Sequence, residues 1–185
     1  YKRQLYDYAE DAESEEDAIE DYPVTLFLSQ HGYFKKITPQ SLRMSGEQKF
    51  KEDDALSMSV ESSNAAELMF FTDKAQVYKT RASDFADGKA SQLGDYLPAK
   101  LGMDEGESVM GMVLPGDYSG YMIFFFENGK AAKVELSAYK TTSNRRRLTG
   151  AYSDKSPLVT ILPLREDQEL VLLSSEPRAG GGTWA

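Results

Sequence analysis

One short pattern occurs three times in this chain and limits what it can fold into. Each copy is an apolar stretch, a short polar turn that ends in Gly or Ala, and a second stretch that ends in a cation. The copies span residues 26–36, 69–79 and 123–133, and a weaker fourth copy spans residues 170–179. The turn residues are Gly32, Ala75, Gly129 and Pro177, which are 43, 54 and 48 residues apart. A repeat of this period predicts an array of small β units.

The residues after each turn also follow a common order. Ten residues beyond the turn residue stands a large apolar residue, which is Leu42, Phe85 or Tyr139. A polar loop of variable length follows at residues 44–54, 86–106 and 141–156, and another apolar stretch follows at 55–60, 108–114 and 158–162. Short apolar stretches at regular spacing predict an all-β assembly. No part of the repeats has a long helical apolar period, so we expect only short helices there.

Two of the predicted strands carry almost no polar side chain. Residues 121–126 are apolar or aromatic throughout, and residues 68–71 are similar. Such runs are typical of strands that are covered on both faces, as in the inner strands of propeller-like blades. A plain β-sandwich core is compatible with the same runs, but the repeat in the flanking turns favours blades.

The formal net charge of −9 is unevenly distributed. Nine acidic residues and no basic residue lie within residues 7–21, so the rest of the chain has 21 acidic and 21 basic residues and is neutral. Acidic runs of this kind are usually solvated linkers. An alternative is that this run competes with a polyanion for the basic surface of the repeats. The chain has no cysteine, which excludes disulfide scaffolds and is consistent with a reducing cytoplasm.

Several of these stretches resemble the C-terminal domain of the A-type subunits of bacterial type IIA topoisomerases, the family of DNA gyrase and topoisomerase IV. Residues 23–36 carry the resemblance, together with residues 68–78 and residues 169–176. The matched stretches lie in the family's order from residue 2 to about residue 179. The resemblance implies a β-pinwheel, a propeller-like array of four-stranded blades that exchange strands with their neighbours.

We therefore expect an all-β pinwheel or propeller-like array of about three to four blades, preceded by an acidic linker. The expected divisions are a linker at residues 1–21, blades near residues 22–66, 67–118 and 119–167, the start of a fourth blade at 168–179, and a flexible end at 180–185.

The chain departs from the family's pattern in two ways. Pinwheels of this family have about five or six blades, whereas this chain carries three and the start of a fourth. The gyrase protein also has a basic glycine-rich box after its first hairpin, which it needs for wrapping DNA. The corresponding residues 41–51 contain one glycine and a glutamate, and residues 144–150 are at best a degenerate relative of the box. These departures argue against strong chiral wrapping and favour a protein that is topoisomerase IV-like or otherwise diverged.

DNA binding requires cations on an accessible edge, where they displace counterions from phosphates. The repeats supply cations at similar positions after the turns, and loop cations extend the set. Solubility and protection of strand edges would also explain lysines at these positions. With the family resemblance we favour phosphate contact by a subset, in which residues 145–147 rank first. The predicted set is Lys35, Lys36, Arg43, Lys79, Arg81, Lys130, Lys133, Lys140, Arg145, Arg146, Arg147 and Arg178.

The function that the resemblance implies is binding and bending of a DNA segment for ATP-dependent strand passage. The implied partners are double-stranded DNA, the ATPase B-type subunit, which is a separate chain, and the rest of the A-type subunit. The implied location is the bacterial cytoplasm at the nucleoid, without a membrane. No base-reading constellation is visible, so binding should be largely independent of sequence and sensitive to salt and DNA bendability.

We expect no catalytic residue, cofactor or metal in this chain, because ATP and magnesium would be used by other parts of the parent enzyme. None of the 11 tyrosines lies in the family's cleavage context, and the single histidine, His31, has no second histidine or cysteine to complete a metal site. Two alternatives remain open. One is a repeat-built module for protein–protein interaction without DNA binding, and the other is an enzyme domain on a β-sandwich, which no titratable cluster supports.

Overall fold

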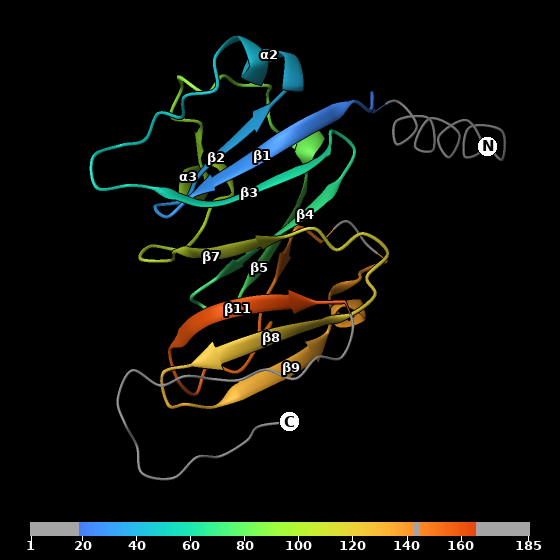
Figure 1. The fold of residues 1–185 in the computed structure, drawn as a ribbon. Coiled ribbons are helices and arrows are strands. Elements are labelled where there is room, and N and C mark those ends of the chain that lie inside the picture. Colours follow the sequence, from blue (N-terminus) through green and yellow to red (C-terminus); the bar gives the residue numbers. More distant parts are fainter. Residues whose placement is uncertain (1–18, 143–144, 166–185) are drawn as a thin grey trace, which may run out of the picture.

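The computed structural model describes residues 19–142 and 145–165. These residues form three antiparallel sheets that follow one another along the molecule in the order of the repeats (Figure 1). Each sheet contains the hairpin formed around one of the repeated turns, so the prediction of an all-β array is confirmed. In strand order the sheets are β3 (Leu56–Ser63), β1 (Pro23–Ser29), β2 (Tyr33–Ile37) and β6 (Asp95–Tyr96); β10 (Arg147–Leu148), β5 (Val77–Arg81), β4 (Glu67–Thr72) and β7 (Val109–Val113); and β11 (Leu158–Leu164), β8 (Tyr121–Phe126) and β9 (Ala131–Glu135).

The first two sheets each take one strand from the following repeat. Strand β6 follows the second hairpin in sequence, but it pairs with β2 in the first sheet. Strand β10 follows the third hairpin and pairs with β5 in the second sheet. This is the exchange between neighbouring blades that the family resemblance implies, and it ties each sheet to the next.

The hairpin turns need a left-handed backbone at one residue. Gly32, Ala75 and Gly129 have φ angles of 89°, 54° and 78°. Glycine adopts this conformation without steric conflict, whereas alanine does so at some energetic cost. The turn at Ala75 is supported from outside, because its N–H donates to the hydroxyl of Tyr152 and its carbonyl accepts from the amide of Ala151.

Strand β4 shows why the second repeat has an uninterrupted apolar run. Leu68 and Phe70 belong to a core cluster shared with the first sheet, whereas Met69 and Phe71 belong to a cluster shared with the third. Successive side chains of a strand point to opposite faces, so a strand between two cores has no solvent-facing position. The prediction that this strand is covered on both faces is confirmed, and Figure 1 shows its sheet between the other two.

Short helical turns follow the second strand of each hairpin. They are α2 (Pro39–Met44), η1 (Ala82–Asp84) and η2 (Leu136–Tyr139), and a further helix, α3 (Leu97–Lys100), follows β6. The large apolar residues that were predicted at these points pack inward, since Phe85 and Tyr139 are buried and Leu42 is half-buried. No helix within the described ranges combines the length and the apolar character that crossing a bilayer requires.

Parts of the predicted divisions fall outside the described residues. They are the linker up to residue 18, the start of a fourth blade at 168–179 and the end at 180–185. The last linker residues contact the segment between the first two repeats. The side chain of Asn64 donates to the carbonyl of Glu20 (2.7 Å), and the amide of Ala65 donates to the carboxylate of Asp21 (3.0 Å).

Candidate nucleic-acid interface

The repeats place a lysine four residues beyond each turn residue, at Lys36, Lys79 and Lys133. The three lysines occupy equivalent positions in the hairpin registers. Their environments differ, because Lys36 and Lys79 are only 3% and 8% exposed whereas Lys133 is exposed. Lysines at equivalent positions of the repeat therefore differ in their access to solvent.

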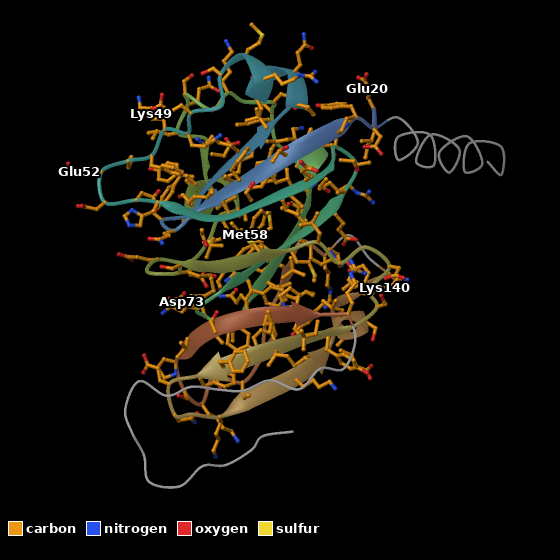
Figure 2. All side chains as sticks on the ribbon, in the orientation of Figure 1. Glu20, Lys49, Glu52, Met58, Asp73 and Lys140 are labelled. Carbon is orange, nitrogen blue, oxygen red and sulfur yellow. The ribbon has the colours of Figure 1, made fainter. Side chains whose placement is uncertain are left out.

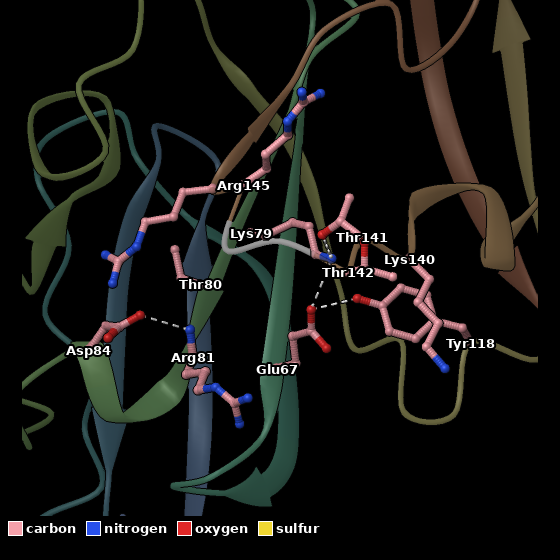
Figure 3. A pocket seen from close by; sticks show the side chains of 11 residues that line it. Glu67, Lys79, Thr80, Arg81, Asp84, Tyr118, Lys140, Thr141, Thr142 and Arg145 are labelled. Carbon is pink, nitrogen blue, oxygen red and sulfur yellow. Dashed lines mark hydrogen bonds and ion pairs between the residues drawn. The ribbon is translucent and has the colours of Figure 1, made fainter. Parts of the chain in front are cut away.

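The ammonium group of Lys79 is bound from several sides (Figure 3). It lies 3.2 Å from the carboxylate of Glu67, and it donates to the carbonyl of Tyr139 (3.1 Å) and the hydroxyl of Thr141 (3.2 Å). The ring centre of Tyr118 lies 5.2 Å away, and the hydroxyl of Tyr118 donates to Glu67. Because Tyr118, Tyr139 and Thr141 flank the third hairpin, Lys79 joins the second repeat to the third.

Lys36 has a similar arrangement one repeat earlier. Its ammonium group donates to Asn64 and lies 3.3 Å from the carboxylate of Asp87 and 5.8 Å from the ring centre of Tyr22. Burial, together with the hydrogen bond to Asp87, raises the pKa of Tyr22 to about 12. Asn64 and Tyr118 both lie eleven residues before the turn residue of the repeat that follows them. Both buried lysines therefore bind the same point of the connection to the next repeat.

Lys35 is also buried, and its ammonium group donates to the carbonyls of Lys49 (3.1 Å) and Ala90 (3.2 Å). Burial lowers the pKa of Lys35. The prediction that Lys35, Lys36 and Lys79 lie on an accessible edge is therefore wrong. A buried ammonium group needs partners inside the protein, and these three have them.

Arg147 is engaged differently from its two neighbours in the sequence. Its guanidinium lies 2.5 Å from the carboxylate of Asp104, donates to the side chain of Gln76 and lies 5.5 Å from the ring centre of Tyr78. Hydrogen bonds from Gln76 and Arg147 hold the pKa of the Asp104 carboxyl below its usual range. Since Arg147 is in β10, these contacts fasten the exchanged strand to β5, and its charge is compensated.

Besides the buried Lys79, four of the predicted cations line one pocket of about 420 Å³ at the ends of β4 and β5, namely Arg81, Lys140, Arg145 and Arg146. All four side chains are exposed. Within the described part of the chain none of them forms an ion pair. The structure therefore gathers positive charge that is not neutralised internally at the junction of the second and third repeats.

None of the other predicted cations within the described residues lines this pocket. Arg43 is exposed on α2, and Lys130 and Lys133 are exposed in the third hairpin (Figure 2 shows the side chains over the whole array). The ammonium group of Lys133 lies 4.0 Å from the ring centre of Tyr121. Arg178 falls outside the described residues.

Sequence reasoning missed the uncharged and acidic residues of the pocket, among them Glu67, Thr80 and Tyr118. A signal existed for Thr80, because the equivalent positions of the other repeats hold Ile37 and Val134. Glu67 carried the same kind of signal, because the equivalent positions of the other repeats hold Val24 and Tyr121, whereas nothing in the sequence marked Tyr118.

No family model matches this chain. Among curated proteins, the topoisomerase IV A-type subunit of Staphylococcus epidermidis is 29% identical over 157 residues, which are 82% of this chain and 20% of the relative. The DNA gyrase A-type subunit of Mycoplasma pneumoniae is 30% identical over 143 residues, which are 73% of this chain and 17% of the relative. The chain thus spans at most a fifth of the length of these two relatives.

Solved structures show the same relationship at the level of the fold. The C-terminal domain of DNA topoisomerase IV superposes with a TM-score of 0.70 at 23% identity, over 78% of this chain and 46% of that one. The C-terminal domain of ParC from E. coli superposes with a TM-score of 0.59 at 16% identity, over 78% of this chain and 57% of that one. The chain is therefore a homologue of the A-type subunits of DNA gyrase and topoisomerase IV, and it has the β-pinwheel fold of their C-terminal domains.

Proposed function

We propose that this chain binds and bends double-stranded DNA as the C-terminal part of the A-type subunit of a type IIA topoisomerase. The observation that carries the proposal is the group of exposed cations Arg81, Lys140, Arg145 and Arg146, none of which forms an ion pair with another described residue. Cations of this kind neutralise phosphates and release counterions, which gives binding that depends on salt rather than on base sequence. The names of the relatives, a DNA gyrase and a DNA topoisomerase, support DNA as the ligand.

In the parent enzyme the chain would hold a DNA segment for ATP-dependent strand passage in the cytoplasm. Its partners would be the ATPase B-type subunit, which is a separate chain, and the rest of the A-type subunit. We propose that it supplies no catalytic group and no cofactor, and that ATP and magnesium act elsewhere in the enzyme. The lack of an intact basic glycine-rich box in residues 41–51 favours a topoisomerase IV-like role. Exposed cations occur in all three repeats, so DNA that contacts several repeats would bend with the array, and deformable sequences should bind more tightly.

The test is a titration of a labelled duplex, followed by fluorescence anisotropy at about 50 and 200 mM salt. We expect the double variant Arg145→Ala/Arg146→Ala to bind about tenfold or more weakly at low salt. Each neutralised phosphate contributes about 0.9 to the salt slope, so the slope should become shallower by nearly two.

A matched control removes the same charge elsewhere. Lys74 lies in the turn of the second hairpin and Lys155 lies beside the turn of the third, and both are exposed. The variant Lys74→Ala/Lys155→Ala should retain affinity within about twofold, because surface charges outside the contact are screened at these salt concentrations. Equal losses in the two double variants, or no binding by the unchanged chain, would show the proposal to be wrong.

A further inference from the structure

The pocket beside Arg81 is built from two repeats and carries an excess of positive charge. Five cationic and two acidic side chains line it, so its formal charge is three positive. Both acids are already engaged. Glu67 pairs with Lys79 and accepts from Tyr118, and Asp84 accepts from the backbone N–H of Arg81. A pocket with these properties suits an oxyanion.

Thr80 supplies an independent observation that points to a ligand. It lines the same pocket, and Figure 3 shows it between Arg145 and the pair formed by Arg81 and Asp84. The residue is 8% exposed, and among the described residues its buried hydroxyl has no hydrogen-bond partner. Buried polar groups are nearly always hydrogen-bonded, and leaving one unpaired is unfavourable. This hydroxyl is therefore a free donor at the edge of a cationic pocket.

The fold does not require a hydroxyl at this position. In the hairpin registers Thr80 is equivalent to Ile37 in the first repeat and Val134 in the third. Valine has the shape of threonine and equal or greater strand propensity. Packing and backbone preference alone would therefore favour an apolar residue here, as in the other two repeats.

We infer that this pocket seats a single phosphate group of the DNA backbone, with Thr80 as a hydrogen-bond donor to the phosphate and with Arg81, Lys140, Arg145 and Arg146 as its counter-charges. The inference rests on the proposed function and adds a fixed contact point to it. Thr80 and Arg81 belong to the second repeat, whereas the other three cations follow the third hairpin. A phosphate held between them bridges two repeats and sets where the duplex crosses their junction.

The test compares Thr80→Val with Thr80→Ser in the same duplex titration. Removing a hydrogen bond to a charged group should weaken DNA binding by about tenfold. The loss should be the same at both salt concentrations, because no charge is removed and the salt slope is unchanged. Thr80→Ser should bind as the unchanged chain does. Urea unfolding should show Thr80→Val to be as stable as the unchanged chain or slightly more stable, which a merely structural role for the hydroxyl would not produce.

A second arm separates a DNA phosphate from a free one. Inorganic phosphate and pyrophosphate are titrated against the chain while the amide signals of residues 79–81 and 141–142 are followed by NMR. If the unchanged chain binds DNA and Thr80→Val binds it equally well, the assignment of this pocket to a DNA phosphate is wrong, but the proposed function stands. If pyrophosphate shifts these signals but duplex DNA does not bind, the pocket takes a free phosphoanion, and both proposals are wrong as stated.

Discussion

The side chain of Lys79 helps to hold the second and third repeats together. Its ammonium group pairs with Glu67 of its own repeat and donates to Tyr139 and Thr141 beyond the third hairpin. Lys79→Met keeps the apolar stem of the side chain and removes its charge, which leaves Glu67 without its cationic partner. Breaking a buried pair is strongly destabilising, but the side chain of Glu67 is 31% exposed, which reduces the effect. We expect a loss of about 2 kcal/mol in the free energy of unfolding, measured by urea denaturation.

The exposed Lys130 provides the matched control for this variant. Lys130→Met should change the free energy of unfolding by less than about 0.5 kcal/mol. The double variant Lys79→Met/Glu67→Gln should regain part of the stability, because no uncompensated charge is left. Similar small effects for both single lysine variants would contradict the assignment of Lys79 to the joint.

The ion pair of Arg147 with Asp104 makes the free energy of unfolding depend on pH. The pKa of Asp104 is lowered in the folded chain, first by the hydrogen bond from Gln76 and then by that from Arg147. A lowered carboxyl pKa stabilises the fold above the usual value, near about 4, and this stabilisation is lost as the pH falls through the folded value. The stability difference between the unchanged chain and Arg147→Ala should therefore be largest near about pH 7 and shrink below about pH 4.

Urea midpoints measured from about pH 3 to about pH 7 check this prediction. Acidic groups that do not interact with Arg147 contribute equally to both proteins, so they cancel in the difference. A difference that stays constant across this range would mean that Asp104 is not the partner that matters.

At the scale of elements, the exchanged strand β6 depends on close approach of two backbones. Gly94, just before β6, has φ +95°, and a Cβ atom there would lie 2.4 Å from the carbonyl oxygen of Phe34 in β2. Gly94→Ala should therefore destabilise the chain by more than about 2 kcal/mol, because steric conflict adds to the backbone strain. Gly102 also has positive φ (+63°), but a Cβ there would meet nothing within 4 Å.

Gly102→Ala therefore isolates the strain alone, and its loss should be about 1 kcal/mol. Hydrogen exchange should locate the additional damage of Gly94→Ala in the amides of β2 and β6. Equal losses for the two variants, without local exchange in β2, would contradict the dependence of β6 on this contact.

At the scale of the whole molecule, each sheet contacts mainly its neighbours. The free energy of unfolding should therefore be approximately a sum of contributions from the repeats and from the interfaces between them. Phe124 packs between the second and third sheets, with its ring centre 5.7 Å from that of Phe71 and 4.7 Å from that of Tyr152. Phe124→Ala should cost about 3–5 kcal/mol and should expose the amides of β8, β9 and β11 to exchange before those of the first sheet.

Phe34 packs at the other joint, with its ring centre 5.6 Å from that of Phe70. Phe34→Ala should therefore reverse the order and expose the first sheet first. Uniform loss of protection in both variants would show that the array unfolds as one unit and not repeat by repeat.

The all-β class, the three hairpins and the family could all be predicted from the sequence. They follow from local and periodic properties, namely left-handed turn residues such as Gly32 and Ala75 and apolar runs that only a strand with two covered faces can hold. The strands β6 and β10, with two residues each, are too short to show a period, and they form because β2 and β5 offer a free edge.

The solvent access of the cations, in contrast, follows from the tertiary structure. Lys36 and Lys133 occupy the same place in their repeats, but one is buried and the other exposed. Burial depends on what the neighbouring repeat places above each lysine, as Asn64 and Asp87 do for Lys36. The residues that cover Lys36 lie far from it in the sequence, so the sequence around the lysine does not predict its burial.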